Sequence, residues 1–218
     1  MPWYEQTKTS KIIHFGNGPG LYLGNIFDTV GLVKYNPFGI TAVLDVSTEP
    51  DYDRHPNILY LRVPFPDGHE IPPDKFATCM AFLTFCWDNN HVVLVNCAAG
   101  ISRSTSIVVS FLHYAGLGVQ CFTPPLETMD SILDYVRFCR PIVFPAPKVF
   151  NSCKKWLRVW PYDSYGYTPK HKLDTVNVNL LMHTSPECEV RQSILAGDNR
   201  ERHLLKCPCT SMRFDKRE

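Results

Sequence analysis

The sequence predicts an α/β fold in which a central, largely parallel sheet is flanked by helices. Along the first 160 residues, short apolar runs bounded by turn residues alternate with segments whose apolar residues recur at helical spacing. Two of the runs, 42–44 and 92–95, are continuously apolar, as expected of strands buried on both faces. Strands that alternate with helices in this way form layered α/β sheets.

The predicted strands are the short apolar runs at 21–23, 40–46, 58–63 and 91–96. Between the third and fourth runs, a helix is predicted after Pro72-Pro73, because proline favours the first helical turn. Its apolar residues fall on one face and are Phe76, Cys79, Met80, Leu83 and Trp87.

Two further helices are predicted near the end of the alternating region. The first has its apolar face at Leu126, Met129, Leu133 and Val136. We expect Thr123 as its N-cap, Pro124 in its first turn and a stop at Arg140-Pro141. The last helix has its apolar face at Val149, Phe150, Cys153 and Leu157.

The character of the sequence changes near Trp160. Residues 161–169 form a turn-rich connector, and 170–218 hold one strand-like run within a polar, charge-mixed remainder. We therefore expect one catalytic domain over 1–160 and a C-terminal extension over 161–218, whose composition is compatible with partial disorder.

Composition and charge exclude several classes of partner. The formal net charge is +1, so no global field draws the protein to nucleic acid or to a membrane surface. No apolar run reaches the length of a membrane span, and the first residues lack the apolar core of a signal peptide. The nine cysteines are scattered through apolar stretches, which is typical of reduced thiols. We expect a cytoplasmic protein, with nuclear entry left open.

Residues 92–109 are the segment that carries chemistry. A buried strand ends at Cys97, a small loop containing Gly100 follows, and a helix starts near Ser102. This geometry presents successive backbone N–H groups to an anion. The helix terminus and Arg103 favour the thiolate form of Cys97, and a guanidinium can bind two phosphate oxygens at once.

A Cys-x5-Arg spacing is weak evidence alone, because it also occurs at Cys207 and Arg213. In that second copy Pro208 removes a backbone donor, no glycine intervenes and no buried strand precedes it. We interpret that copy as a chance match. The copy at Cys97 has the strand, the glycine and the helix together.

The segment Cys97-Ala98-Ala99-Gly100-Ile101-Ser102-Arg103-Ser104 resembles the signature loop of the dual-specificity protein phosphatases, within the protein tyrosine phosphatase superfamily. Residues 20–24 and 39–46 resemble two of the family's strands, and 140–145 with Phe150 its late helix boundary. The likeness covers roughly 15–160. No basic docking cluster precedes this region, and in this respect the chain resembles the small, atypical members of the family.

The resemblance implies a site and a mechanism. Cys97 is the nucleophile, and the phosphate lies in the backbone cradle formed by Ala98, Ala99, Gly100, Ile101, Ser102 and Arg103. Asp67, after the segment 60–66, is the general acid that protonates the leaving group, preferred over Asp74 at a helix start. Ser104 hydrogen-bonds the sulfur and assists hydrolysis of a phosphocysteine intermediate. No metal and no cofactor are expected.

Two residues depart from the family pattern. Asn96 stands where the family usually has His before the cysteine, and we expect position 96 to lie against the thiolate and to affect its reactivity. Ala146 stands where the family often has Asn, a change expected to affect local packing only.

The loop side chains at 98, 99 and 101 carry no charge, unlike the lysine-bearing loops of phosphoinositide phosphatases. The expected substrate is a protein phosphorylated on tyrosine or on serine/threonine. Two alternatives stay open: a phosphoprotein-binding module with weak turnover, and a phosphatase of a non-protein substrate. A zinc site in the extension is a further hypothesis, on His183, Cys188, His203, Cys207 and Cys209. The oligomeric state is left open.

Overall fold

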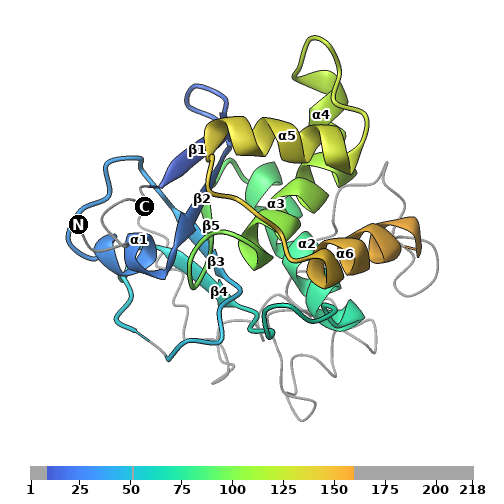
Figure 1. The fold of residues 1–218 in the computed structure, drawn as a ribbon. Helices are drawn as coiled ribbons and strands as arrows, with labels where there is room; N and C mark the ends of the chain where they lie inside the picture. The colour runs from blue at the N-terminus through green and yellow to red at the C-terminus, as the bar shows by residue number, and fades with distance from the viewer. Residues whose placement is uncertain (1–8, 51, 160–218) are drawn as a thin grey trace, which may run out of the picture. The chain divides into compact units, whose positions relative to one another are not determined.

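The structure is a computed structural model that describes residues 9–50 and 52–159. The predicted extension over 161–218 and the hypothetical zinc site therefore lie outside the described residues. The elements run in the order β1 (Ser10–His14), β2 (Gly20–Asn25), α1 (Ile26–Gly31), β3 (Ala42–Asp45), β4 (Leu59–Arg62), α2 (Pro73–Asp88), β5 (Val92–Cys97), α3 (Arg103–Tyr114), α4 (Leu117–Gln120), α5 (Met129–Cys139) and α6 (Pro147–Val159) (Figure 1).

The sheet confirms the predicted architecture. Its strand order is β1-β2-β5-β3-β4, and the pairs β2–β5, β5–β3 and β3–β4 are all parallel. The four predicted strands appear at their expected places. The strand that was not predicted is β1, which pairs antiparallel with β2 at the edge of the sheet. Only Ile12 of β1 is buried, so the strand lacks the apolar run that revealed the others.

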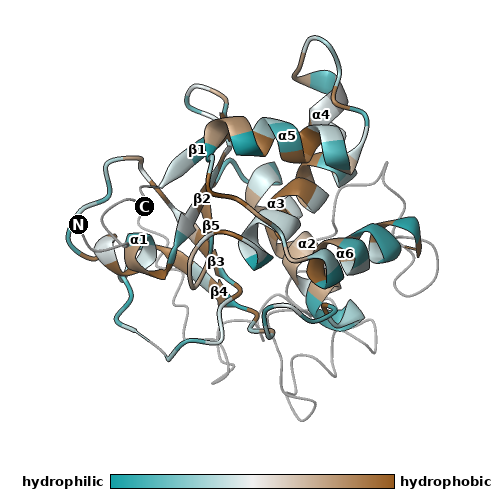
Figure 2. Cartoon of the chain, viewed as in Figure 1, coloured by the Kyte–Doolittle hydropathy of each residue, from teal (hydrophilic) through white to brown (hydrophobic). Residues whose placement is uncertain are grey.

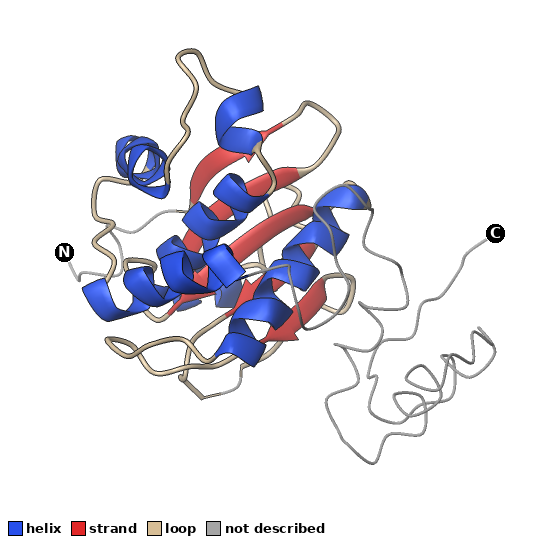
Figure 3. Cartoon of the chain, turned by 90° about the vertical axis from the view of Figure 1, so that its right-hand side faces the viewer, coloured by secondary structure: helices blue, strands red, loops and turns tan. Residues whose placement is uncertain are grey.

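Helices cover one face of the sheet. Figure 3 shows helices lying over the sheet. The central helix is α3, which packs on β2 and β5 and contacts α2, α5 and α6. The short helix α1 packs on β2 and β5 from the other side of the sheet (Figure 1). Figure 2 shows apolar residues along the strands and polar residues along much of α6, as expected for a helix with one buried side.

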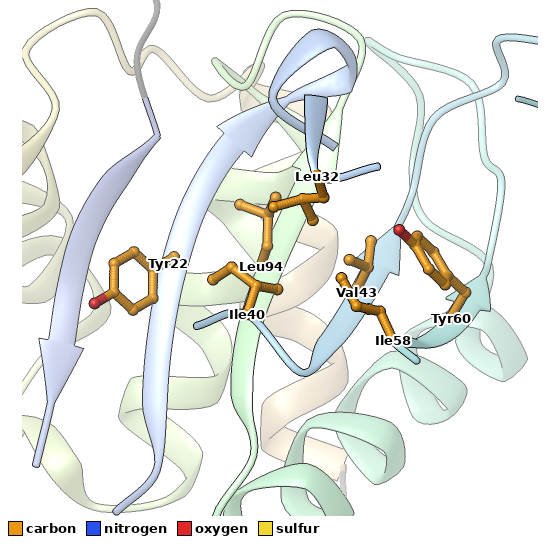
Figure 4. Close-up of a cluster of buried hydrophobic side chains, with 7 residues drawn as sticks. All are labelled: Tyr22, Leu32, Ile40, Val43, Ile58, Tyr60 and Leu94. Carbon is orange, nitrogen blue, oxygen red and sulfur yellow. The ribbon is translucent and has the colours of Figure 1, made fainter. Parts of the chain in front are cut away.

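The opposite face of the sheet has its own buried cluster (Figure 4). Alternation along each strand places Tyr22, Leu94, Val43 and Tyr60 on this face, because these residues are direct neighbours across β2, β5, β3 and β4. Three residues from the adjoining segments complete the cluster, and they are Leu32, Ile40 and Ile58. The sheet is thus buried on both faces, in keeping with its continuously apolar strands.

One helix start was predicted wrongly. The helix α5 begins at Met129 with Thr128 as its N-cap, rather than near Thr123 and Pro124. The Thr128 side chain accepts a hydrogen bond from Ser131 N at 3.1 Å, and Ser131 Oγ accepts one from Thr128 N at 3.1 Å. This reciprocal pair satisfies two N–H groups at the helix start, and Thr123 has no such partner three residues later.

Candidate active site

The site lies at the carboxyl end of β5, between β2 and β3. Cys97 is the last residue of this strand and is 1% exposed, and α3 begins six residues later at Arg103. Ligands in open α/β sheets bind outside the carboxyl ends of the strands, where neighbouring connections leave the sheet in opposite directions. The parallel core of the sheet therefore places the predicted loop at the position that such folds use for ligands.

Donors outside the loop hold three of its carbonyl groups, and Ile101 O has two of them, because Thr105 Oγ1 of α3 also donates to it at 3.0 Å. Ala98 O accepts from Ile26 N at 3.3 Å, and Ile101 O accepts from Phe144 N at 3.0 Å. Gly100 O accepts from the buried Arg140 Nε at 2.9 Å. Since carbonyl and N–H groups of a tight loop point in opposite directions, carbonyls fixed outward leave the N–H groups facing the loop interior. This is the arrangement that binds an oxyanion.

Gly100 is required by both conformation and space. Its φ is +67°, and a Cβ built there would lie 2.4 Å from Gly24 O and 2.8 Å from Arg140 Nη2. A side chain at this position would push the loop away from β2 and from its anchoring arginine.

Gly100→Ala is expected to destabilise the fold by at least roughly 2 kcal/mol and to abolish most turnover, because strain and clash act together. Gly39→Ala is the matched control. Its φ is +62° but nothing lies within 4 Å of the added Cβ, so it carries the strain without the clash. Thermal unfolding and initial rates measure both variants. Equal effects of the two substitutions would contradict the close packing of the loop.

The sulfur of Cys97 has a hydroxyl partner. Ser104 Oγ donates to Cys97 Sγ at 3.2 Å, and both residues are buried. Burial raises the pKa of three other buried cysteines, Cys79, Cys86 and Cys153, the last to about 12. Those three thiols stay protonated and contribute to packing. Cys97 differs from them because it ends β5 at the start of the loop.

Arg103 is 4% exposed and held at the edge of the loop. Its Nη1 donates to Phe65 O at 3.1 Å, and its Nε lies 3.6 Å from Asp67 Oδ2. Within the described part of the chain, the buried Nε–H has no hydrogen-bond acceptor. A buried guanidinium with a donor to spare beside an N–H cradle is suited to an anion with several oxygens.

Asp67 reaches the same site from the loop after β4. Its side chain is 48% exposed, and its Oδ1 accepts from Ser102 Oγ at 2.8 Å. Asp74 instead lies in the first turn of α2. The structure thus brings the four residues predicted to act chemically into one place, and they are Cys97, Arg103, Asp67 and Ser104.

A family model of the dual specificity phosphatase catalytic domain matches residues 21–151, more than half of the 218 residues. The chain belongs to the dual specificity phosphatase family. Dual specificity protein phosphatase 15 of Homo sapiens is 36% identical over 131 residues, which are 59% of this chain and 41% of that protein. Dual specificity protein phosphatase 22-A of Danio rerio is 34% identical over 188 residues, which are 82% of this chain and 87% of that protein.

Among solved structures, the crystal structure of DUSP15 matches with a TM-score of 0.54 and 32% identity, covering 67% of this chain and 87% of that one. The chain spans 41% to 54% of the length of the dual specificity protein phosphatase 15 relatives from human, mouse and rat. The likeness therefore concerns the catalytic domain of these dual specificity phosphatases.

Contrary to the expectation for this member of the dual specificity phosphatase family, the side chain of Asn96 does not lie against the thiol. Successive residues of a strand point to opposite faces, so Asn96 and Cys97 face away from each other. Asn96 Nδ2 donates to Asp45 Oδ1 at 2.9 Å, and Arg62 Nε lies 3.4 Å from Asp45 Oδ2. The Asn96 side chain instead links the end of β5 to β3.

Sequence reasoning missed Arg140 as a part of the site. It was interpreted as a helix stop, but it is 3% exposed and holds the loop through Gly100 O. Burial lowers the pKa of Arg140, while the charges of Asp28 and Cys97 favour its cationic form. Neither the burial of Arg140 nor its contact with Gly100 O, 40 positions away, could be read from the sequence around it. The backbone N–H of Ala146 donates to Ser102 Oγ at 3.0 Å, a contact that does not depend on the side chain at this position.

Across residues 9–50 and 52–159, no group of three or more His, Cys, Asp or Glu side chains is placed to hold a metal ion. Over the same ranges, none of the helices combines the length and the apolar character needed to cross a membrane.

Proposed function

We propose that this chain is a cysteine-dependent protein phosphatase that hydrolyses phosphotyrosine and phosphoserine/threonine monoesters through a phosphocysteine intermediate. One observation carries the proposal. Cys97 Sγ accepts a hydrogen bond from Ser104 Oγ and lies at the base of a loop whose carbonyl groups are held by donors outside it. Arg103 and Asp67 lie at the edge of the same loop. Membership of the dual specificity phosphatase family supports the same assignment.

In the first step, the Cys97 thiolate attacks phosphorus and the bond from phosphorus to the ester oxygen breaks. The carboxyl group of Asp67 gives its proton to that oxygen, so the alcohol or phenol leaves neutral. The loop N–H groups and Arg103 stabilise the charge on the equatorial phosphate oxygens. The product of this step is a phosphocysteine and an Asp67 carboxylate.

In the second step, water attacks the phosphocysteine. The Asp67 carboxylate takes a proton from the water, the bond from phosphorus to sulfur breaks and inorganic phosphate is released. The departing thiolate keeps the hydrogen bond from Ser104 Oγ, which lies 3.2 Å away before any reaction. The site is then back in its starting protonation state.

A protein substrate is supported by the rim of the loop. Phe144, whose N–H bonds Ile101 O, is 71% exposed, and the loop side chains at 98, 99 and 101 are uncharged. Such a rim suits the side chains of a protein better than the additional phosphates of a polyanionic headgroup. The alternative of a binding module with weak turnover is disfavoured by the presence of the full set of Cys97, Arg103, Asp67 and Ser104.

Turnover of p-nitrophenyl phosphate in the presence of EDTA tests the reaction class. We expect EDTA to leave the rate unchanged, because the proposed chemistry uses no metal. A panel of phosphotyrosine and phosphoserine/threonine peptides, set beside phosphoinositides and sugar phosphates, then tests the substrate. Loss of activity with EDTA would contradict the mechanism, and faster hydrolysis of the non-protein phosphates would contradict the substrate class.

A further inference from the structure

Ser102 occupies an unusual position in the site. It is the N-cap residue of α3 and is 7% exposed, yet its side chain makes no capping hydrogen bond to the helix. Serine at this position ordinarily accepts from an N–H of the first turn, which stabilises a helix by about 1 kcal/mol. Here the hydroxyl is turned away from α3 and bonds two other segments, at Asp67 and at Ala146.

The two partners settle the direction of the hydrogen bonds. Ala146 N can only donate, so Ser102 Oγ accepts from it at 3.0 Å. The single hydroxyl proton of Ser102 is then available for Asp67 Oδ1, 2.8 Å away. Ser102 Oγ thus accepts from Ala146 N through one lone pair and donates its proton to Asp67 Oδ1.

A second donor acts on the same oxygen. Gly68 N donates to Asp67 Oδ1 at 2.8 Å. With two donors on Oδ1, a proton bound by this carboxyl group belongs on the other oxygen, Oδ2. That oxygen faces Arg103, with Nε at 3.6 Å, and therefore faces the residue that binds the phosphate.

We propose that Ser102 is a positioning residue, which holds Asp67 so that its transferable proton is carried on Oδ2 and points at the leaving-group oxygen. This inference rests on the proposed function, in which Asp67 is the general acid. Asp67 is 48% exposed and lies in a loop, so loss of the Ser102 bond leaves Gly68 N and Arg103 to hold the carboxyl group and increases the population of alternative rotamers in solvent. Without this hydrogen bond, the carboxyl group of Asp67 is less often oriented correctly for proton transfer to the leaving group.

The test compares two substrates that differ in their need for an acid. Ser102→Ala keeps the backbone N–H of residue 102, so the cradle and its binding of inorganic phosphate are expected to be unchanged. Hydrolysis of an alkyl phosphate should slow roughly 10- to 100-fold. Hydrolysis of p-nitrophenyl phosphate, whose leaving group departs with little assistance, should slow by a much smaller factor. Ser102→Thr retains a hydroxyl and should restore most of the alkyl phosphatase rate.

Ser110→Ala is the matched control. Ser110 is another buried serine of α3, and its hydroxyl donates to Ser106 O at 2.7 Å, away from the catalytic groups. This variant should change neither the ratio of the two rates nor phosphate binding.

A double-mutant cycle separates this inference from the proposed function. If Ser102 acts through Asp67, then Ser102→Ala should add little to the loss already caused by Asp67→Asn. An equal loss on both substrates, or a full additional loss in the Asp67→Asn background, would overturn the positioning role while leaving Asp67 as the acid. If Asp67→Asn itself shows no difference between the two substrates, the acid assignment fails and this inference with it.

Discussion

Cys97→Ser should lose at least about 10⁴-fold in turnover while still binding a phosphotyrosine peptide. A serine hydroxyl is a poor nucleophile without an adjacent base, and the hydroxyl neighbour at 3.2 Å, Ser104, is itself a weak acid. The loop N–H groups and Arg103 are unaffected by the change, so the phosphate keeps its binding partners. Steady-state rates measure the first expectation and isothermal calorimetry the second.

Cys121→Ser is a suitable control, because Cys121 is a partly exposed, free cysteine beyond the end of α4. It should behave as the unchanged protein in both measurements. Retention of most activity by Cys97→Ser would show that the nucleophile is elsewhere. Loss of both turnover and binding, with the fold intact, would show that the loop is not the phosphate site.

Asp67→Asn should slow hydrolysis of an alkyl phosphate by roughly 10²- to 10⁴-fold. An amide accepts the hydrogen bonds of a carboxyl group at one oxygen but has no acidic proton to give, so the leaving alkoxide departs unprotonated. An activated aryl phosphate should lose less, since its leaving group is already stable as an anion. Rates for a series of leaving groups of increasing basicity measure the difference.

Asp74→Asn provides the comparison for this prediction, because Asp74 lies in the first turn of α2. The substitution should reduce only the favourable interaction between a negative side chain and a helix start. A larger rate loss from Asp74→Asn, or equal losses of Asp67→Asn on all leaving groups, would move the acid to another residue.

The parts of this site that the sequence could predict are those formed by neighbouring residues. A buried strand, a small loop and a helix start follow one another within residues 92–109, so their periodicity and glycine content are visible together. The contacts that complete the site join residues far apart in the chain. Ser102 and Asp67 are 35 positions apart, and Arg140 and Gly100 are 40 apart. No local pattern records which distant donor meets which carbonyl.

The edge strand and the start of α5 were missed for related reasons. Only Ile12 of β1 is buried, so the sequence of β1 gives little indication of a strand. The segment is extended because it pairs with β2. In α5, two threonines precede the apolar face, and Thr128 becomes the cap because Ser131 reciprocates its hydrogen bond. Asn96 was expected beside the thiol because it directly precedes Cys97, but alternation along the strand points the two side chains to opposite faces of the sheet.

The outward anchoring of the phosphate loop links activity to segments that take no part in chemistry. Two of its anchors, Arg140 and Phe144, lie in the connection between α5 and α6, and another, Ile26, starts α1. Opening of the connection alone would release Gly100 O and remove one of the two donors to Ile101 O, the other being Thr105 Oγ1, while most of the sheet stayed intact. Partial unfolding of this kind costs less free energy than global unfolding. On heating, catalytic inactivation should therefore precede the loss of overall secondary structure.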